Sequence, residues 1–376
     1  MKTNHLLTAS AAALCALIVL PICVQANAIA YTVTDLGILS GGVASWASGI
    51  NASGQVVGGS LAKGNSTNHV LAWTGTTPVE LTNPGGNFSR GSAINDFGQV
   101  AGRAGIDGGS FAHAIRWTGT TPTDLGTLGG TNSTGHGINA SGQVSGSSQI
   151  NGNGATRAVR WTGTTAEELG HLGGTYSEGY GINAAGQIAG YSYTPANGAR
   201  AVRWTGTLPA NLGTLGGNSS VGTAINDSGQ VAGFSNTVLG AEHAVRWTGI
   251  TAEDLGTLGG TNSQAVGINA DGDVIGMSDL IGNTTQHAFL YTGGIMYDLF
   301  TLLILGSGIT DLTVISDGNS INDSGQIAGY GNIGGQPHAL RLVPVVAPEP
   351  TSAVLLFGGA VLLGLRRRRC HPTQAR

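Results

Sequence analysis

Residues 180–215 read YGINAAGQIAGYSYTPANGARAVRWTGTLPANLGTL, and variants of this stretch fill most of the 376-residue chain. A tryptophan-containing string and an Asp-Leu-Gly-Thr-Leu-Gly-Gly string each recur seven times, the last copies being degenerate. An insertion around residues 302–313 accounts for the longest spacing between units. A fixed period of this length indicates a protein built from repeated supersecondary units. The string Ile-Asn-x-x-Gly also recurs seven times, at spacings of 44, 44, 44, 43, 43 and 53 residues, with its asparagines at Asn51, Asn95, Asn139, Asn183, Asn226, Asn269 and Asn322.

Each unit is predicted to form four short strands. In the fourth unit we expect strands at 180–182, 187–192, 200–205 and 209–213, with a tight turn at 183–186 joining the first two. Asparagine favours such a turn through side-chain hydrogen bonds, and glycine supplies the positive φ. Four strands in about 40–50 residues are typical of a propeller blade.

The repeats begin and end part-way through a unit. Residues 31–36 read as a fourth strand without its blade, and residues 338–342 as a third strand without its partner. Pairing the two would remove both open sheet edges, so we predict an all-β, seven-bladed propeller over 29–346 that is closed by the N-terminal strand. A β-solenoid is the alternative. Third-strand arginines and the polar or acidic residues eight positions later are predicted to lie opposite each other, which would place Arg341 across from Asp35.

The composition narrows the function classes. The chain contains 65 glycines, only 10 % charged residues, and lysine only at Lys2 and Lys63. This excludes a helix-rich enzyme, a coiled coil and a basic nucleic-acid-binding protein. The hydrophobic fraction of 40 % and the periodic glycines argue against disorder.

The first 28 residues read as a secretory signal peptide. Lys2 precedes an apolar run over 9–22, and the small residues Ala26 and Ala28 form a cleavage pattern. A lipoprotein signal at Cys23 is the alternative, which the bulky Ile22 disfavours.

The last segment, 347–376, has three parts in a fixed order. Pro348, Glu349 and Pro350 precede an uncharged run over 351–365 that is shorter than the about 20 residues of a free-standing bilayer span. A basic cluster follows, typical of a cytoplasmic stop. The cluster consists of Arg366, Arg367, Arg368 and Arg369.

This tripartite tail resembles the PEP-CTERM sorting signal of Gram-negative bacteria, over residues 347–369. The resemblance implies export through the inner membrane, transient anchoring there by a C-terminal transmembrane helix, and processing by an exosortase-type enzyme near the Pro-Glu-Pro. It also implies delivery to the cell surface or the exopolysaccharide. A plain C-terminal anchor is the alternative.

The repeats themselves resemble the HAF repeat family of bacterial extracellular proteins, over about residues 31–343. The form His287-Ala288-Phe289 matches the family's name, while two units carry Arg157 and Arg200 in place of the histidine. The resemblance implies an extracellular repeat protein and no particular activity. The histidine position is otherwise kept as His69, His113, His243, His287 and His338.

Without its two processing signals the chain is strongly acidic. Residues 29–350 contain 10 basic and 20 acidic residues, a net charge of −10. All three cysteines, Cys15, Cys23 and Cys370, lie outside this part, so no disulfide is expected. The negative charge argues against direct binding of anionic polymers without bridging cations.

Aromatic residues are the best candidates for ligand contacts. The repeated Trp73, Trp117, Trp161, Trp204 and Trp247 occupy one strand position and are predicted to form inter-blade core rather than a sugar-stacking surface. Aromatic residues outside that position are the predicted ligand-binding residues: Trp46, Tyr176, Tyr180, Tyr191 and Tyr193.

No catalytic, metal or cofactor motif is evident. The chain lacks Gly-x-Ser-x-Gly, Walker and His-Glu-x-x-His motifs, and no acid pair stands out. Arginine replaces the repeated histidine in two units, which argues against a metal ring. The Asn-x-x-Gly turns look faintly like calcium loops but lack a bidentate carboxylate at the right spacing. We therefore expect no catalytic residue, no metal and no cofactor.

These observations favour a secreted, surface-sorted protein that is a non-catalytic structural or binding component of the exopolysaccharide or biofilm matrix. The first alternative is a carbohydrate-active enzyme, a polysaccharide lyase or glycosidase. It would require off-pattern residues such as Glu178, Tyr180, His136 and His171 to meet at one mouth of the channel. The second alternative is a scaffold that binds other surface proteins through its variable loops, at 61–68, 103–110, 148–156 and 193–199.

Overall fold

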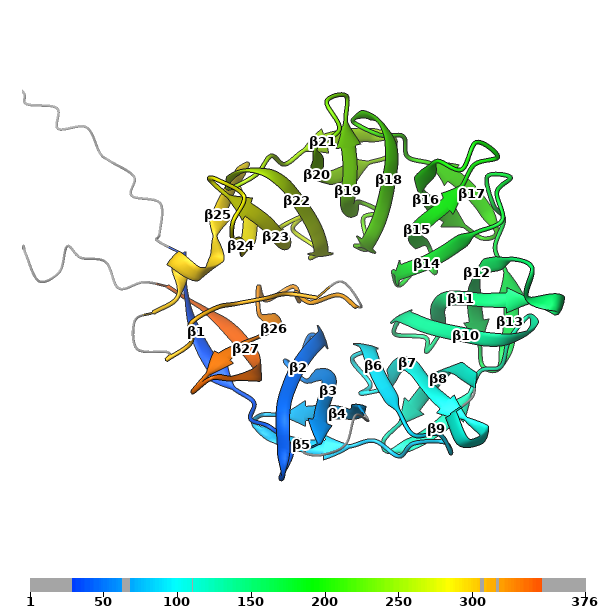
Figure 1. Ribbon diagram of the computed structural model, residues 1–376, viewed down its shortest axis with the longest axis horizontal. Coiled ribbons are helices and arrows are strands. Elements are labelled where there is room, and N and C mark those ends of the chain that lie inside the picture. Colours follow the sequence, from blue (N-terminus) through cyan, green and yellow to red (C-terminus); the bar gives the residue numbers. More distant parts are fainter. Residues whose placement is uncertain (1–28, 63–67, 110, 305–307, 316–317, 347–376) are drawn as a thin grey trace, which may run out of the picture. The chain divides into compact units, whose positions relative to one another are not determined.

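The computed structural model describes residues 29–62, 68–109, 111–304, 308–315 and 318–346. They form seven antiparallel sheets arranged around a central axis (Figure 1), which confirms the predicted all-β seven-bladed propeller. The predicted signal peptide and the C-terminal sorting helix lie outside the described residues. Within the described residues, no helix is long and apolar enough to cross a membrane.

Six blades each have four consecutive strands. The first contains β2 (Gly42–Ile50), β3 (Val56–Ala62), β4 (Asn68–Thr74) and β5 (Thr77–Glu80). The second contains β6 (Ser89–Ile94), β7 (Val100–Ile106), β8 (Phe111–Thr118) and β9 (Thr121–Asp124). The third contains β10 (Gly129–Ile138), β11 (Val144–Ile150), β12 (Thr156–Thr162) and β13 (Thr165–Glu168).

The remaining three regular blades repeat this order. The fourth contains β14 (Ser177–Ile182), β15 (Ile188–Tyr193), β16 (Ala199–Thr205) and β17 (Leu208–Asn211). The fifth contains β18 (Gly216–Ile225), β19 (Val231–Thr237), β20 (Glu242–Thr248) and β21 (Thr251–Asp254). The sixth contains β22 (Gly259–Ile268), β23 (Val274–Leu280), β24 (Gln286–Thr292) and β25 (Ile295–Asp298). Short 3₁₀ turns are η1 (Asp107–Gly109), η2 (Asn151–Asn153) and η3 (Leu299–Leu302).

The seventh blade joins the two ends of the repeat region. Its sheet has the order β1-β27-β26, in which β1 (Ile29–Asp35) comes from the start of the chain and β26 (Ile327–Ile333) and β27 (Gln336–Val346) from its end. The backbone N–H of Leu36 donates to the carbonyl of Ala339 at 2.9 Å. The predicted closure by the N-terminal strand is therefore confirmed.

The inner part of the seventh blade is irregular. Thr313 pairs with Tyr330 through two backbone hydrogen bonds of 2.8 and 2.9 Å. Further along, Asn319 Nδ2 donates to the Ile268 carbonyl of the sixth blade at 3.2 Å, and Ser320 Oγ donates to the Ser48 carbonyl of the first blade at 3.0 Å. This segment thus ties the blades on both sides of it together near the axis.

The predicted arginine–acid pairing is wrong by one residue. The turn between the third and fourth strands contains two residues, so Thr162 pairs with Thr165 and Arg160 lies opposite Glu167. Glu168 instead forms an ion pair with Arg157, at 3.3 Å. The acid therefore pairs with the repeated His/Arg position, its diagonal neighbour across the hairpin.

The same correction applies where the chain ends meet. The partner of Asp35 is His338, with Nδ1 3.0 Å from the carboxylate, and Arg341 Nη1 donates to the Gly54 carbonyl of the first blade at 2.9 Å. The repeated histidines thus pair with fourth-strand acids. The other pairs are His69–Glu80, His113–Asp124, His243–Asp254 and His287–Asp298.

The repeated tryptophans form inter-blade core, as predicted. All five are at most 1 % exposed, and each packs with a leucine or alanine of the preceding or same blade. Trp117 and Trp204 also donate their indole N–H to the carbonyls of Thr82 and Gly170. Burial of these large rings adds apolar area to the packing between blades.

The repeated asparagines explain the Asn-x-x-Gly turn. In each unit the Asn Oδ1 accepts the backbone N–H four residues later, as Asn183 does from Gln187 at 2.9 Å. The amide Nδ2 donates to the carbonyl of the next blade's asparagine, so the side chain must be both donor and acceptor. Such bonds of 2.9–3.2 Å run from Asn51 to Asn95, Asn95 to Asn139, Asn139 to Asn183, Asn183 to Asn226, Asn226 to Asn269, and Asn322 to Asn51.

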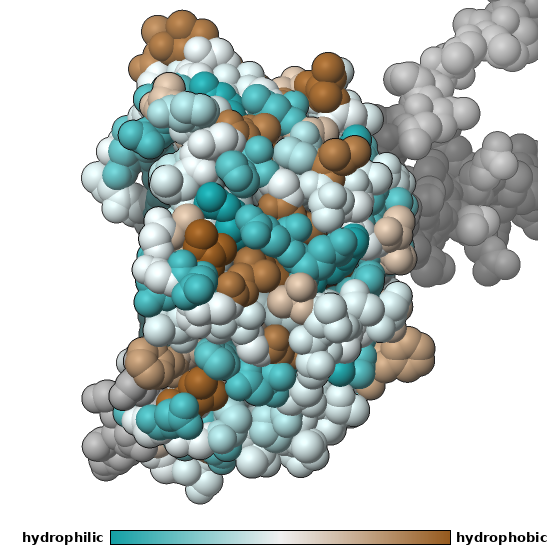
Figure 2. All heavy atoms as spheres, turned by 90° about the vertical axis from the view of Figure 1, so that its right-hand side faces the viewer, coloured by the Kyte–Doolittle hydropathy of each residue, from teal (hydrophilic) through white to brown (hydrophobic). Residues whose placement is uncertain are grey.

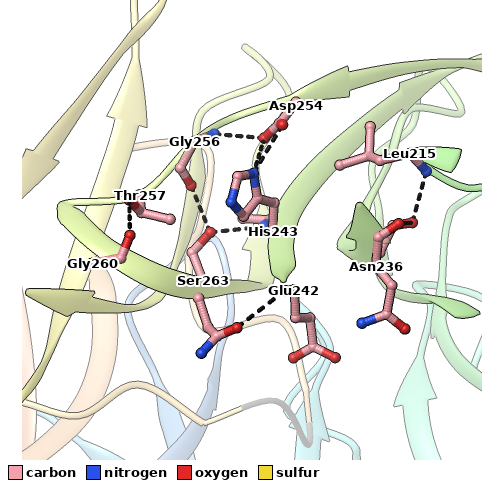
Figure 3. A network of polar contacts seen from close by, with 12 residues as sticks. Leu215, Asn236, Glu242, His243, Asp254, Gly256, Thr257, Gly260 and Ser263 are labelled. Atoms are coloured by element: carbon pink, nitrogen blue, oxygen red, sulfur yellow. Dashed lines mark hydrogen bonds and ion pairs between the residues drawn. The ribbon is translucent and has the colours of Figure 1, made fainter. Parts of the chain in front are cut away.

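Buried serines add a second set of inter-blade bonds. Ser263 Oγ accepts the N–H of Ala244 at 2.8 Å and donates to the carbonyl of Gly256 at 2.6 Å, beside the His243–Asp254 pair (Figure 3). The sequence analysis did not single out these serines. Equivalent acceptors are Ser45, Ser89, Ser133, Ser177 and Ser220.

The rim of the propeller carries dispersed apolar side chains. Figure 2 shows small apolar groups on the rim separated by hydrophilic residues. Large exposed apolar residues include Leu208, Leu239, Ile250 and Ile281.

Candidate functional site

Two facing positions of each blade vary while the framework positions repeat. They lie on the first and second strands, five residues before and eight residues after the repeated asparagine. These side chains are not needed for the contacts that recur in every repeat. We therefore expect residues at these positions to determine ligand specificity. The opposed pairs are Trp46–Gly59, Arg90–Arg103, Thr134–Ser147, Glu178–Tyr191, Val221–Phe234 and Gln264–Met277.

A buried carboxylate occupies this position in the fourth blade. Glu178 on β14 is 8 % exposed, and its Oε1 lies 2.8 Å from His136 Nε2 on β10. Ser147 on β11 donates its hydroxyl to the same oxygen at 3.0 Å. Because the carboxylate can only accept, His136 donates from Nε2. Glu178 thereby links the fourth blade to the third.

Three tyrosine hydroxyls converge on the other oxygen of Glu178. Tyr176, Tyr180 and Tyr191 donate to Oε2 at 3.1, 3.4 and 3.2 Å. The rings of Tyr176 and Tyr191 are stacked, with centroids 5.7 Å apart and planes 20° apart, and Tyr193 lies 5.8 Å from Tyr176. The four rings form one aromatic cluster, hereafter the tyrosine cluster.

The pKa values of Glu178 and of the tyrosines bonded to it are shifted away from neutral pH. Burial raises the pKa of Glu178, but hydrogen bonds from His136, Ser147 and Tyr176, with the charge of His136, outweigh burial and hold it at about 2. Burial and the Glu178 charge raise the pKa of Tyr176 to about 12. The same two causes raise the pKa values of Tyr180 and Tyr191. Glu178 is therefore ionised and the tyrosines are neutral at physiological pH.

This assignment predicts a pH-dependent contribution of Glu178 to stability. A carboxyl with an ordinary pKa near 4.3 when unfolded and about 2 when folded contributes about 3 kcal/mol above pH 5, and the contribution is lost as pH falls toward 2. Glu178→Gln should therefore destabilise the protein most near pH 6, with the difference from wild type shrinking below pH 4. Urea unfolding across pH 3–7 measures it, and a difference independent of pH would contradict the assignment.

An open cavity of about 220 Å³ adjoins the cluster. The fourth blade contributes Tyr176 and Glu178 to its wall, and the second blade contributes Arg103. The third blade lies between them. Its contributions are all polar or hydroxyl-bearing: Asn132, Ser133, Thr134, Ser147, Ser148, Gln149 and Thr156.

The structure separates the sequence-predicted ligand residues. Tyr176, Tyr180, Tyr191 and Tyr193 come together, whereas Trp46 lies on β2 of the first blade and packs against Gly59. The singleton His136 joins the cluster. His171 does not: its Nδ1 accepts the backbone N–H of Gly173.

Ser147 and Arg103 were not predicted from the sequence to belong to the site. Their departure from the repeat at the facing positions was the available signal.

The polar side chains of the Asn-x-x-Gly turns form hydrogen bonds within the turn and to the next blade. Their asparagine oxygens accept backbone N–H groups, and in the described residues no three His, Cys, Asp or Glu side chains are grouped so as to hold a metal ion. Asp227, from an Asn-Asp turn, accepts the N–H of Ala184 in the preceding blade at 2.8 Å. These turns therefore serve inter-blade packing.

Comparisons with known proteins find only solved structures of low sequence identity. No family model matches the chain, and no curated protein does. Among solved structures, a putative TolB from Agrobacterium tumefaciens is 14 % identical, with a TM-score of 0.43 over 62 % of this chain and 84 % of that one. A mutant of AofleA from Arthrobotrys oligospora is 13 % identical, with a TM-score of 0.41 over 72 % and 88 %. The Aleuria aurantia lectin in complex with Fucalpha1-6GlcNAc is 12 % identical, with a TM-score of 0.31 over 58 % and 75 %.

Proposed function

We propose that this protein is exported, sorted to the cell surface, and binds polysaccharide of the extracellular matrix at the tyrosine cluster without cleaving it. The observation that carries the proposal is the set of tyrosine rings held by one buried carboxylate beside a polar cavity. Export and sorting are supported by the signal-like segments 1–28 and 347–376.

The cluster suits a sugar because its polar and apolar parts are separated. The hydroxyls of Tyr176 and Tyr191 point to Glu178, and Tyr191 is stacked between Tyr176 and Tyr180. Tyr176 is the ring of the cluster that lines the cavity, where it can meet the apolar face of a pyranose. The serine, threonine and glutamine side chains of the cavity supply hydrogen-bond partners for sugar hydroxyls. Glu178 orders the rings before the ligand arrives, which reduces the entropic cost of binding.

The same chemistry disfavours the enzyme alternative. Glu178, Tyr180 and His136 do meet, as that alternative requires. However, a general acid or base works best with a pKa near the working pH. Glu178 at about 2 and Tyr176 at about 12 are both far from it. A glycosidase would also need a second carboxylate at about 5–10 Å, and the hydrogen-bonding groups around Glu178 are a histidine, a serine and tyrosines.

Binding can be measured by co-sedimentation of the purified mature protein with exopolysaccharide from the producing cells. We expect saturable retention and a polymer of unchanged length. Tyr176→Ala should weaken retention at least about tenfold, since loss of one aromatic contact of about 1.4 kcal/mol has that effect. Phe97→Ala is the matched control, because Phe97 is 78 % exposed on an Asn-x-x-Gly turn outside the cavity.

The other outcomes select the alternatives. Shortening of the polymer during incubation would establish the enzyme. Absence of retention with an intact polymer would contradict glycan binding and favour a protein scaffold acting through the variable loops. Equal effects of the tyrosine and phenylalanine substitutions would show that the cluster is not the contact surface.

A further inference from the structure

Two arginines stand outside the repeat. Residues 29–350 contain nine arginines, and seven of them occupy repeated positions. The third-strand arginines donate to a glycine carbonyl of the next blade, as Arg116 does to Gly142 at 2.9 Å. Arg157 and Arg200 replace the repeated histidine. Only Arg90 and Arg103 have no counterpart in the other units, so the repeat architecture does not account for them.

These two arginines face each other on neighbouring strands. Arg90 on β6 is directly opposite Arg103 on β7, an arrangement of like charges that is unfavourable in a sheet. Burial and the charge of Arg103 lower the pKa of Arg90.

Arg103 is exposed and lines the cavity beside the tyrosine cluster. The second blade therefore contributes a cation, Arg103, to the cavity wall, and the fourth blade contributes the Glu178 carboxylate. Five hydrogen-bond donors already surround that carboxylate. Its volume of about 220 Å³ is below the roughly 300 Å³ at which pockets for drug-sized ligands begin, so it suits one ring of a longer chain.

We propose that this cavity takes a uronate unit of an acidic polysaccharide, which names the ligand class within the function proposed above. The sugar carboxylate lies on the guanidinium of Arg103, because a planar carboxylate matches a guanidinium fork. The ring stacks toward Tyr176, and its hydroxyls contact Thr134, Ser147 and Gln149. The chain's net charge of −10 over 29–350 makes a local cation such as Arg103 necessary for an acidic ligand.

The test compares one polymer in charged and neutral forms. Titration of the mature protein with polygalacturonate and with fully methyl-esterified polygalacturonate isolates the carboxylate. We expect the wild type to bind the charged form at least about tenfold more tightly, as one charge-assisted contact of about 1.4 kcal/mol would produce. Arg103→Gln should abolish this preference. Arg160→Gln is the control, because it removes the same charge from an ion pair with Glu167 on the outer hairpin. This variant should retain the preference for the charged polymer.

Four results would overturn the assignment. A preference retained in Arg103→Gln would exclude Arg103 as the carboxylate partner. Equal or stronger binding of dextran sulfate that also depends on Arg103 would indicate a sulfate site instead. If both polygalacturonate forms bound equally and Tyr176→Ala abolished the binding of both, the uronate proposal would be refuted but glycan binding at the cluster would stand. If no polymer bound, including the native exopolysaccharide, both the uronate proposal and the proposed glycan binding would be refuted.

Discussion

Gly146→Ala is expected to lower the free energy of unfolding by at least about 3 kcal/mol, the upper range for overpacking of a rigid interior. A Cβ at Gly146 would lie 1.9 Å from the Thr134 carbonyl oxygen and 2.9 Å from Trp161 Cζ3. The first contact is with backbone of the neighbouring strand, so a rotamer change cannot relieve it. The strand pair β10–β11 would have to separate, and the polar cavity beside it would change shape.

Gly154→Ala is the control within the same blade. Gly154 has φ −75°, and no atom lies within 4 Å of the place that an alanine methyl group would take, so alanine there should be neutral or stabilise by up to about 1 kcal/mol. Urea unfolding of both variants at one pH measures the difference. Similar midpoints for the two variants would mean that the strands are not packed as closely in solution as described. The same close approach, at 1.9–2.0 Å, recurs at Gly58, Gly102, Gly190, Gly233 and Gly276.

This close packing, repeated in successive blades, explains why the repeat can be recognised from the sequence. Three kinds of residue recur at one period because each has equivalent neighbours in successive blades. They are the closely packed glycine, the asparagine that both donates and accepts hydrogen bonds, and the buried tryptophan. The strands predicted in the fourth unit agree with β14–β17 to within about three residues at each end. Periodicity therefore predicted the blades and their closure.

Register across the third hairpin was not predictable from spacing in the same way. A separation of eight residues placed Arg160 opposite Glu168, but a two-residue turn makes Glu167 the opposed residue. In a strand, one residue of error exchanges the two faces. The turn length is set by the φ of Gly163, which is +65°, and the repeat period contains no information about it.

The candidate site was predictable only in part. Tyr176, Tyr180, Tyr191 and Tyr193 are off-pattern aromatics, and the alternation of strand faces brings them together. The link from Glu178 to His136 spans 42 residues and joins two blades, and it depends on how β14 packs beside β10 of the third blade. Residues that depart from the repeat indicate such sites. Which of these residues contact one another depends on the packing between blades.

The second large effect concerns the ring closure. Leu36→Ala is expected to lower the free energy of unfolding by about 3 kcal/mol, as a fully buried leucine does. Leu36 is 1 % exposed and packs between Ala339 of the seventh blade and Trp73 of the first. It lies just after β1, near the start of the described chain, where residues are usually frayed and tolerant.

Leu125→Ala supplies the matched comparison, because Leu125 holds the equivalent position between the second and third blades and is 2 % exposed. In a closed ring the two substitutions should cost similar amounts, while Leu208→Ala, at a site 76 % exposed, should cost almost nothing. If Leu36→Ala behaved like Leu208→Ala, the first strand would be detached in solution and the propeller open. Equal costs at Leu36 and Leu125 would instead mean that the interface between the seventh and first blades is as strong as an interior one. At that interface Asn322 donates to Asn51, as the asparagines of five other blades donate to the next blade, and the His338–Asp35 pair holds β1 to β27 within the seventh blade.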